Sequence, residues 1–431
     1  MHEMILRSCL QLALLSHFSR FSDLHSALIT HHSRTAPSTL LASLMKMKRK
    51  GSFFVVALAV TIRLLWSLDA NPLLLMYDAY LTFSATISTD ASDVAARRMF
   101  GLDATSLEGK TVWITGSSSG IGAELAVQLA SAGVGQLILS GRRIDSLNKV
   151  AKTCRESQMM RADVLGKEQN IDISLVPFDL GQVEELDEAV TKAMEAAPET
   201  GIDIIILNAG QYHCAPALET NVDEALPDLM QINFASPVQL AHKLLHRDRW
   251  KERRYGHIVA VSSLMGRGAS PLNAAYSASK HALRGYFLAL ATEESSWLRV
   301  DVVLPGATDT ELWEKSWSSK KEEDVDGNSS IKQLQADDRS KMSVKRCAQL
   351  ILSSMIAPRY LLFNESWITR NPGLLWVYLA SYAPCTFHVL TSIIAPFRRS
   401  MWERNGEDAL YLPTMVRHML ETIVDSIRVR L

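Results

Sequence analysis

Residues 111–122 read TVWITGSSSGIG, a short apolar run that is followed at once by a glycine-rich turn. Gly116, Gly120 and Gly122 would let the backbone turn sharply and approach a pyrophosphate at the N-terminus of the next helix, where unpaired N–H groups attract anions. The position of the turn strengthens this interpretation, because it follows one predicted strand and opens a predicted helix. A Gly/Ser loop that binds nothing is the alternative. The stretch predicts a dinucleotide-binding turn.

The same alternation of short apolar runs and helix-length segments continues to about residue 370. Strands that are apolar along their whole length, with helices between them, indicate a parallel sheet covered on both faces. The fold class predicted is therefore α/β, with a doubly wound parallel sheet of the Rossmann type. Strands are expected at 111–115, 136–140, 173–178, 203–207, 257–262, 300–304 and 360–363, and helices at 121–132, 183–196, 224–247, 274–298 and 343–356.

The second predicted strand ends in Ser140-Gly141-Arg142-Arg143. A site for NAD usually has an acidic residue about twenty residues after the glycine turn, where it binds the ribose 2′-hydroxyl. Here two guanidinium groups follow instead, and an Arg suits a 2′-phosphate through charge-assisted hydrogen bonds. A solvated helix start is the alternative. The pattern favours NADP(H) as the cofactor.

Tyr276 and Lys280 lie four residues apart in YSASK, so they share one face of the predicted helix. A nearby ammonium stabilises phenolate, and we expect it to lower the Tyr276 pKa from its reference value of about 10 toward working pH. The Tyr can then exchange a proton with a carbonyl or alcohol while a nicotinamide exchanges hydride. A lone Tyr-x-x-x-Lys is usually a surface pair. This one follows the glycine turn, Asn208-Ala209-Gly210 and Ser263 in the same chain.

Taken together, these motifs resemble the short-chain dehydrogenase/reductase family across roughly residues 108–370. The resemblance implies a catalytic tetrad of Asn233, Ser263, Tyr276 and Lys280, in which Ser263 is preferred to Ser262 because its separation from Tyr276 matches the family. Ser263 would orient the substrate carbonyl, Tyr276 would exchange the proton, Lys280 would bind the nicotinamide ribose, and Asn233 would support a water relay. The motifs are TGSSSGIG at 115–122, NAG at 208–210, the Asn of QINFASP at 233, SSLMG from 262, YSASK at 276–280 and PGATDT at 305–310.

The resemblance also implies the cofactor contacts. Asp179 matches the residue that contacts the adenine, Asn208 the residue on the adenine ribose side, and Thr310 the residue that meets the carboxamide, while Thr308 lies where a backbone contact is expected. The predicted cofactor site consists of Gly116, Ser118, Ser119, Gly120, Ile121, Gly122, Arg142, Arg143, Asp179, Asn208, Ala209, Gly210, Tyr276, Lys280, Pro305, Gly306, Thr308 and Thr310, and no metal is expected.

A narrower resemblance is carried by YSASKHALRGYF, by KMSVKRCAQLILSSM and by the apolar tail after Trp367. It is to a membrane-associated branch of the family near the hydroxysteroid and retinol dehydrogenases. It implies attachment to the endoplasmic reticulum and NADP(H)-linked chemistry on apolar carbonyls or alcohols such as retinoids and steroids. The charged segment 314–341 occupies the variable substrate lid of the family, so the resemblance does not name the substrate.

The N-terminal part of the chain differs from this core. Residues 1–50 are rich in Ser and poor in acidic residues, which is typical of a poorly ordered or targeting extension, a mitochondrial transit peptide included. Residues 51–90 contain the apolar run 52–68 behind a basic cluster at 46–50, which favours a membrane anchor and linker. A buried or interfacial helix is the alternative.

The C-terminal part, 371–431, contains a second apolar stretch at 374–397 that is broken by Pro384 and followed by Arg398-Arg399. It predicts a membrane-associated extension that lies at the interface, or a helical pair that covers the substrate pocket, and both can hold. The expected organisation is thus an extension (1–50), an anchor and linker (51–90), a catalytic domain (105–370) and this apolar extension (371–431).

Composition excludes several other classes of protein. With 47% hydrophobic and 21% charged residues, the 431-residue chain can bury a core, which excludes a disordered protein. The 45 basic residues balance 46 acidic ones, which argues against a nucleic-acid partner. Five separated cysteines with no Cys-x-x-Cys exclude a recognisable zinc module. The expected partners are a small apolar carbonyl or alcohol substrate and membrane lipid, and a homodimer is allowed.

The first hypothesis for the function is therefore an NADP(H)-dependent oxidoreductase at the endoplasmic reticulum membrane, with mitochondria as the alternative location. An acyl-chain ketoreductase of lipid metabolism has the same fold and tetrad and stays open. A non-catalytic NADP(H)-binding scaffold is the third hypothesis, and the intact Ser263, Tyr276 and Lys280 count against it.

Overall fold

The computed structural model describes residues 104–165, 171–310, 312, 341–357, 364–369, 373–382 and 384–405. All of them belong to one compact unit, Asp69–Leu431. The extension predicted at 1–50 and the anchor predicted within 51–90 lie outside the described residues. Among the described residues, no helix is both long and apolar enough to cross a bilayer.

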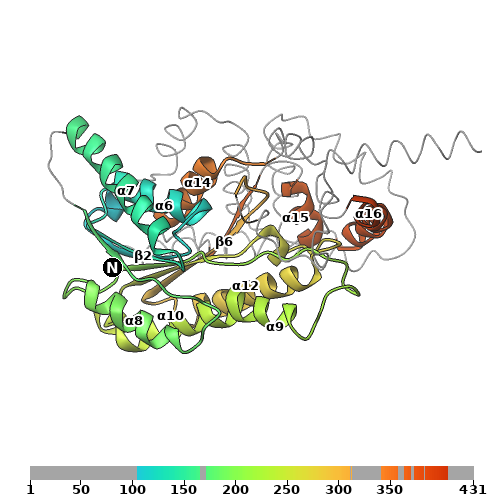
Figure 1. The fold of residues 1–431 in the computed structure, drawn as a ribbon, viewed down its shortest axis with the longest axis horizontal. Helices are drawn as coiled ribbons and strands as arrows, with labels where there is room; N and C mark the ends of the chain where they lie inside the picture. Colours follow the sequence, from blue (N-terminus) through green and yellow to red (C-terminus); the bar gives the residue numbers. More distant parts are fainter. Residues whose placement is uncertain are drawn as a thin grey trace, which may run out of the picture. The chain divides into compact units, whose positions relative to one another are not determined.

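A seven-stranded sheet with the order β3-β2-β1-β4-β5-β6-β7 forms the centre of the described fold (Figure 1). Every neighbouring pair of strands is parallel. The predicted doubly wound α/β fold is confirmed. The seventh strand forms at Glu365–Ile368, whereas the segment 360–363 predicted for it lies outside the described residues. The strands are β1 Thr111–Thr115, β2 Gln136–Ser140, β3 Asp172–Leu175, β4 Ile204–Leu207, β5 Gly256–Val261, β6 Leu298–Pro305 and β7 Glu365–Ile368.

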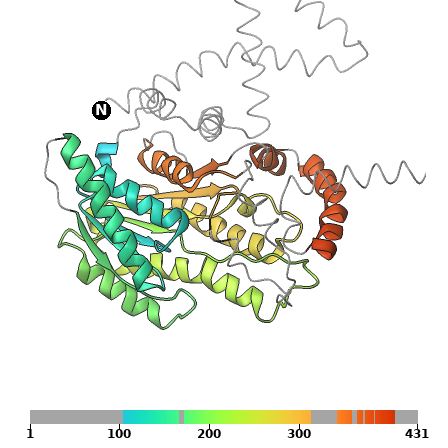
Figure 2. The same ribbon diagram turned by 45° about the horizontal axis from the view of Figure 1, so that its top comes forward.

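Helices cover both faces of the sheet because the strands send apolar side chains alternately to each face. On β1, Val112 and Ile114 enter the core beneath α6, α7 and α14, and Trp113 enters the opposite core against α8, α10 and α12. Figure 2 shows the two helical layers from a second direction. The helices are α6 Gly120–Ala132, α7 Ile144–Leu165, α8 Glu185–Ala196, α9 Ala225–Met230, α10 Ser236–Arg247, α11 Trp250–Arg253, α12 Ala274–Glu293 and α14 Val344–Ile356, with short 3₁₀ helices η1 Ala104–Leu107 and η3 Leu264–Gly266.

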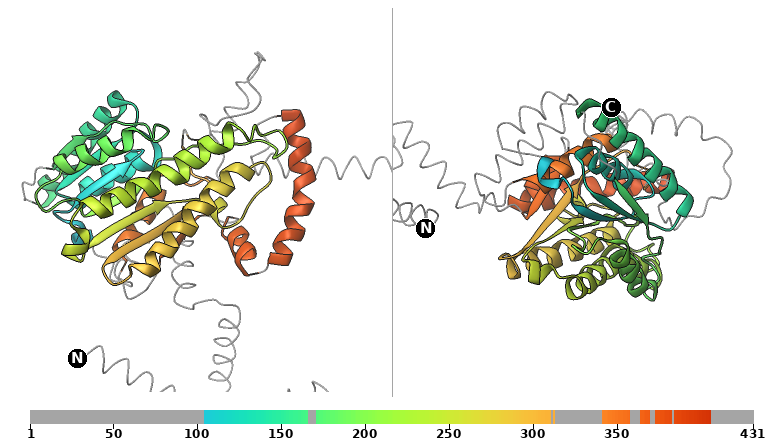
Figure 3. Two further views of the ribbon diagram at one scale, coloured as in Figure 1. Left: turned by 90° about the horizontal axis from the view of Figure 1, so that it is seen from below. Right: turned by 90° about the vertical axis from the view of Figure 1, so that its left-hand side faces the viewer.

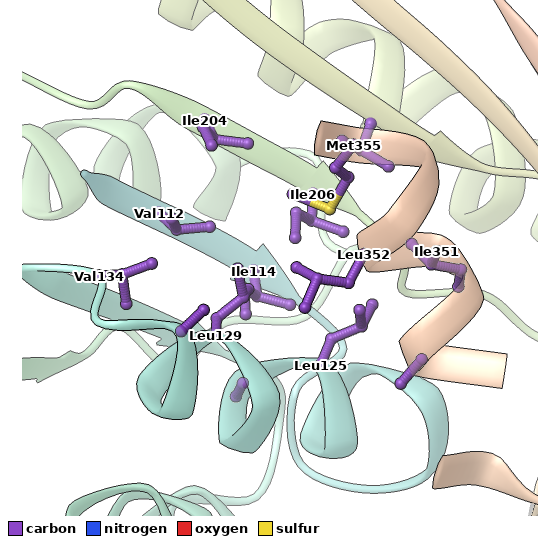
Figure 4. Close-up of a cluster of buried hydrophobic side chains, with 14 of the residues drawn as sticks. Val112, Ile114, Leu125, Leu129, Val134, Ile204, Ile206, Ile351, Leu352 and Met355 are labelled. Carbon is purple, nitrogen blue, oxygen red and sulfur yellow. The ribbon is translucent and has the colours of Figure 1, made fainter. Parts of the chain in front are cut away.

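The first of these cores holds the glycine turn in place. Figure 4 shows Leu125 and Leu129 of α6 pointing toward Ile114 and Ile206, with Leu352 of α14 closing the other side. All five side chains are buried. Each contributes roughly 1.5–3 kcal/mol relative to an exposed position. The start of α6 is therefore fixed against the ends of β1 and β4.

Two helical features bear on the expectations, the first as a difference from the predicted helix and the second as one of the stated alternatives. The helix predicted over 224–247 is divided by a π-helical turn, η2 Gln231–Ala235, and such turns frequently mark functional sites. The apolar stretch after residue 371 forms two helices, α15 Gly373–Tyr382 and α16 Pro384–Asn405, which Figure 3 shows as a pair at one end of the sheet. Of the two alternatives for this stretch, the helical pair is present among the described residues.

Candidate active site

The glycine turn lies where the strand order reverses, because β1 pairs with β2 on one side and with β4 on the other. Open α/β sheets bind ligands at this switch point. Gly116 has φ +67°, and a Cβ there would lie 2.7 Å from the Cα of Ala209. A Cβ on Gly122 would lie 2.3 Å from the Gly116 carbonyl oxygen. Only glycine lets these backbones approach so closely.

The Asn208 side chain ties the ends of β4 and β1 together. Its Nδ2 donates to the carbonyl oxygens of Thr115 and Gly116, at 3.1 Å each. The backbone N–H groups of Asn208 and Ala209 both donate to the Thr115 hydroxyl. No side chain caps the first N–H groups of α6 at Ser119, and the residues at this helix start, 119–121, line the cavity in front of the turn.

One cavity of about 690 Å³ runs from this turn along the carboxyl ends of the strands. Every predicted site residue lines it except Gly122, which packs behind the turn, and Asn233. At one end, Arg142 and Asp179 approach within 3.6 Å. Arg143 lines the same end of the cavity, so two guanidinium groups lie where the second strand ends.

Ser263 and Tyr276 meet in the middle of the cavity. Ser263 follows β5 and caps η3, where its hydroxyl accepts a hydrogen bond from Met265 N at 3.2 Å. The Tyr276 hydroxyl, from the first turn of α12, is hydrogen-bonded to Ser263. The ring of Tyr212 packs edge-on against Tyr276 at 4.9 Å between ring centres. The two hydroxyl groups can therefore bind one substrate oxygen together.

Lys280 and Asn233 lie near Ser263 and Tyr276. The Lys280 Nζ donates to Val261 O at 3.1 Å and lies 5.9 Å from the centre of the Tyr276 ring. Asn233 lies in the π-helical turn. Its side-chain Oδ1 accepts from Gln211 N, and its Nδ2 donates to Gln211 O and to Ser279 Oγ, the latter at 3.0 Å. A Cβ added to Gly210 would lie 3.2 Å from Lys280 Nζ and 3.1 Å from Asn233 Oδ1. The predicted tetrad is thus brought together around the Gly210 loop.

Comparison with known proteins identifies the family. The family profile described as short chain dehydrogenase matches residues 110–321. "Dehydrogenase/reductase SDR family member 7" of Homo sapiens is 36% identical over 276 residues, which are 63% of this chain and 74% of that protein. The chain belongs to the short-chain dehydrogenase family. It is accordingly an oxidoreductase by family.

Two further similarities accompany this assignment. The "Dehydrogenase/reductase SDR family protein 7-like" of Dictyostelium discoideum is 30% identical to this short-chain dehydrogenase over 248 residues, 57% of this chain and 71% of that one. The crystal structure of levodione reductase has a TM-score of 0.49 and 20% identity, and the match covers 62% of this chain and 97% of that one.

Burial is the largest influence on the pKa values of Tyr276 and Lys280 in this short-chain dehydrogenase. Burial raises the pKa of Tyr276 to about 12, against an opposing hydrogen bond from Ser263. Burial lowers the pKa of Lys280 to about 8. The prediction that Lys280 brings the Tyr276 pKa below 10 is wrong for this structure, because desolvation of the phenolate outweighs the hydrogen bond from Ser263. At neutral pH Tyr276 holds its proton and is ready to donate it.

The residues present fit a dinucleotide. Gly116 and Gly122 let the turn pack closely against Ala209 and Asn208, and the start of α6, which no side chain caps, supplies N–H donors. Asp179 holds its loop by accepting from Gly181 N at 2.9 Å, and lines the cavity beside Arg142. Pro305, Gly306, Thr308 and Thr310 line the cavity after β6, and Thr308 also donates to Gly306 O at 3.1 Å.

Several of the residues that line the cavity are absent from the predicted site, among them Tyr212, Asn273 and Arg398. The Tyr212 hydroxyl donates to Asn273 Oδ1 at 2.5 Å, which fixes the ring beside Tyr276. Tyr212 comes two residues after the NAG motif, so its position was a usable signal. Arg398 comes from α16, and only the three-dimensional fold brings it to the cavity.

The helical pair α15–α16 contacts the loop that follows Ser263. Trp376 Nε1 donates to Gly268 O at 3.3 Å, and Arg267 Nε donates to Ser381 Oγ at 2.7 Å. Arg398 Nη1 donates to Pro271 O at 3.3 Å. The helical pair therefore packs against the loop beside the cavity and contributes Arg398 to the lining.

Proposed function

We propose that this protein catalyses the NADP(H)-dependent interconversion of carbonyl and alcohol groups in apolar substrates. One observation carries the proposal: the hydrogen-bonded hydroxyl groups of Ser263 and Tyr276 lie beside the buried Lys280, in the same cavity as the glycine turn. A proton donor, a second oxygen-binding hydroxyl and a dinucleotide cradle are what such a reaction requires.

In the direction of reduction, a nicotinamide cofactor held at the glycine turn would supply hydride to the carbonyl carbon. The hydroxyls of Ser263 and Tyr276 bind the carbonyl oxygen, and Tyr276 gives its proton to that oxygen as negative charge develops. The nearby Lys280 ammonium offsets the charge of the phenolate that remains. Asn233 holds Gln211 and so keeps the Gly210 loop in contact with Lys280. Oxidation of an alcohol runs through the same groups in reverse.

The proposed preference for NADP(H) rests on Arg142 and Arg143. The Arg142 side chain is 71% exposed, so its ion pair with Asp179 contributes little and can give way to a 2′-phosphate. Guanidinium groups bind phosphate oxygens through two parallel hydrogen bonds. The experiment compares kcat/KM for NADPH with that for NADH.

The proposed substrate class, with retinoids and steroids as representatives, is supported by the apolar side chains that line the cavity near Ser263. Leu264, Met265 and Leu312 line it together with the Tyr212 ring. Membrane association, at the endoplasmic reticulum or alternatively in mitochondria, is part of the proposal. It is supported by the exposure of Leu375 (58%) on α15 and of Val389 (57%) on α16. Apolar side chains on the surface of a helix suit an interface between water and lipid.

The test is NADPH oxidation by the membrane-expressed full chain with retinal, steroid ketones, acyl-chain ketones and simple carbonyls, with Tyr276→Phe as the control. We expect turnover that prefers NADPH and is lost in the variant. Retained turnover in Tyr276→Phe would contradict the mechanism. NADPH binding without turnover of any carbonyl would favour a scaffold.

A further inference from the structure

We infer that Arg398 is a specificity-determining residue that selects substrates carrying a carboxylate at the end remote from the reacting carbonyl. The inference rests on the proposed function and deepens it. The substrate class becomes oxo acids or hydroxy acids with an apolar body. The inference is based on the position of Arg398, which belongs to helix α16 and lines the catalytic cavity.

A chain of contacts connects Arg398 to Tyr276. Its Nη1 donates to Ser270 Oγ and to Pro271 O. Asn273 Nδ2 also donates to Pro271 O, at 3.1 Å, and Asn273 Oδ1 accepts from the Tyr212 hydroxyl. The Tyr212 ring then contacts Tyr276. The guanidinium is therefore connected to the Tyr276 ring through the 270–273 loop and Tyr212, and it lines the same cavity.

The charges around this end of the cavity favour an anion. Among the described residues that line the cavity, Asp179 is the one with a carboxylate. It lies beside Arg142, at the end of the cavity where the second strand ends. Glu219, near α16, is bound by the neighbouring Arg399 at 2.5 Å. Burial lowers the pKa of the Arg398 guanidinium, yet an Arg remains charged at neutral pH. A partly desolvated cation gains more from a carboxylate than from a neutral oxygen, because the Coulomb attraction between opposite charges grows as the effective dielectric constant falls.

The anchoring also makes Arg398 a selective group. A guanidinium has five N–H donors in a planar fork that matches both oxygens of a carboxylate. Because Nη1 is already fixed by the loop, little side-chain entropy remains to be lost when a substrate binds. Arg399, one residue further along α16, forms ion pairs with Glu219 and Glu403 and is not among the residues that line the cavity. It supplies a matched control.

The experiment uses the full-length protein with NADPH and a matched pair of long-chain ketones, one ending in a carboxylate and the other in its methyl ester. We expect the wild type to prefer the acid by kcat/KM. Arg398→Ala should raise KM for the acid at least about tenfold, with little effect on kcat or on KM for the ester. Arg398→Lys, which keeps the charge and can keep the loop contact, should recover part of the loss. Arg399→Ala should leave both substrates unchanged.

Two outcomes would overturn the inference. The first is a wild type that does not prefer the acid, and the second is an Arg398→Ala variant that loses acid and ester equally, as a purely structural tether would. Thermal melting of each variant shows whether the helical pair remains folded. If no carbonyl is turned over at all, the proposed function fails separately. Acid and ester binding to the NADPH complex, followed by NADPH fluorescence, then decides whether Arg398 selects the carboxylate.

Discussion

The two ends of the active-site cavity are built in different ways. The dinucleotide end consists mainly of backbone, from the turn after β1, the end of β4 and the first N–H groups of α6. The substrate end consists of side chains from distant parts of the sequence, and Arg398 contacts Ser270 across 128 residues. Local sequence thus determines the cofactor cradle, whereas the assembled fold determines what lies opposite the cofactor.

The largest expected effect falls where the two ends meet. Tyr276→Phe removes one hydroxyl and keeps the ring packed against Tyr212, so we expect kcat/KM to fall by about 10³-fold or more. NADPH affinity, measured by fluorescence, should hardly change. Tyr286→Phe, on the exposed side of the same helix, is the control and should retain full activity. Equal loss in both variants would mean that α12 had been disturbed rather than the chemistry.

The dinucleotide end is most directly tested by glycine substitution. In Gly122→Ala, the new methyl group would lie 2.3 Å from Gly116 O and 2.4 Å from Asn208 Nδ2. Such overpacking costs about 1–3 kcal/mol of unfolding free energy, and we expect NADPH affinity to fall about tenfold or more. Gly285→Ala on α12 meets no atom within 4 Å and should instead stabilise the protein by about 0.5–1 kcal/mol. Urea unfolding and NADPH titration of both variants provide the measurement.

This difference between the ends explains what the sequence could predict. The strand ends and the glycine turn are local features, so β1 and β2 form at their predicted residues and the NAG loop lies against the turn. Asn233 and Lys280 also come to the cavity region, although the π-helical turn that positions Asn233 has no pattern of its own. The Tyr276 pKa was mispredicted because spacing reveals the nearby ammonium but does not reveal the burial of the ring. Arg398 was missed because no periodicity connects α16 to a loop so far away in the chain.

A third prediction concerns the unfolding free energy that is lost by burying the Lys280 ammonium between the two ends of the cavity. Its pKa falls to about 8 in the folded state, below its usual 10.5, so the unfolded chain binds more protons between these values. The contribution of Lys280 to the unfolding free energy should therefore rise as pH increases from about 8 to 10.5, and at pH 7 the full penalty applies. Lys280→Met should stabilise the protein at pH 7 by about 1–3 kcal/mol while abolishing turnover.

Urea unfolding of the wild type and Lys280→Met across this pH range is the measurement. The stability difference between the two proteins should shrink as pH rises, because deprotonation removes the penalty from the wild type. Lys152→Met, at an exposed position, is the control and should follow the wild type. A difference that stays constant with pH would mean that packing of the Met side chain, rather than the buried charge, causes the stabilisation.

The smallest effect is expected from the exposed cations at the dinucleotide end, where solvent screens each interaction. Arg143→Ala should reduce the ratio of kcat/KM for NADPH to that for NADH by about tenfold, through loss of a charge-assisted contact to the 2′-phosphate. Arg142→Ala should reduce it less, because Arg142 must first give up Asp179, 3.6 Å away. Both losses should diminish at high salt, whereas the effect of Arg398→Ala, in a partly buried wall, should persist. If either variant weakens NADPH and NADH equally, these guanidinium groups bind the shared parts of the dinucleotide and the preference originates elsewhere.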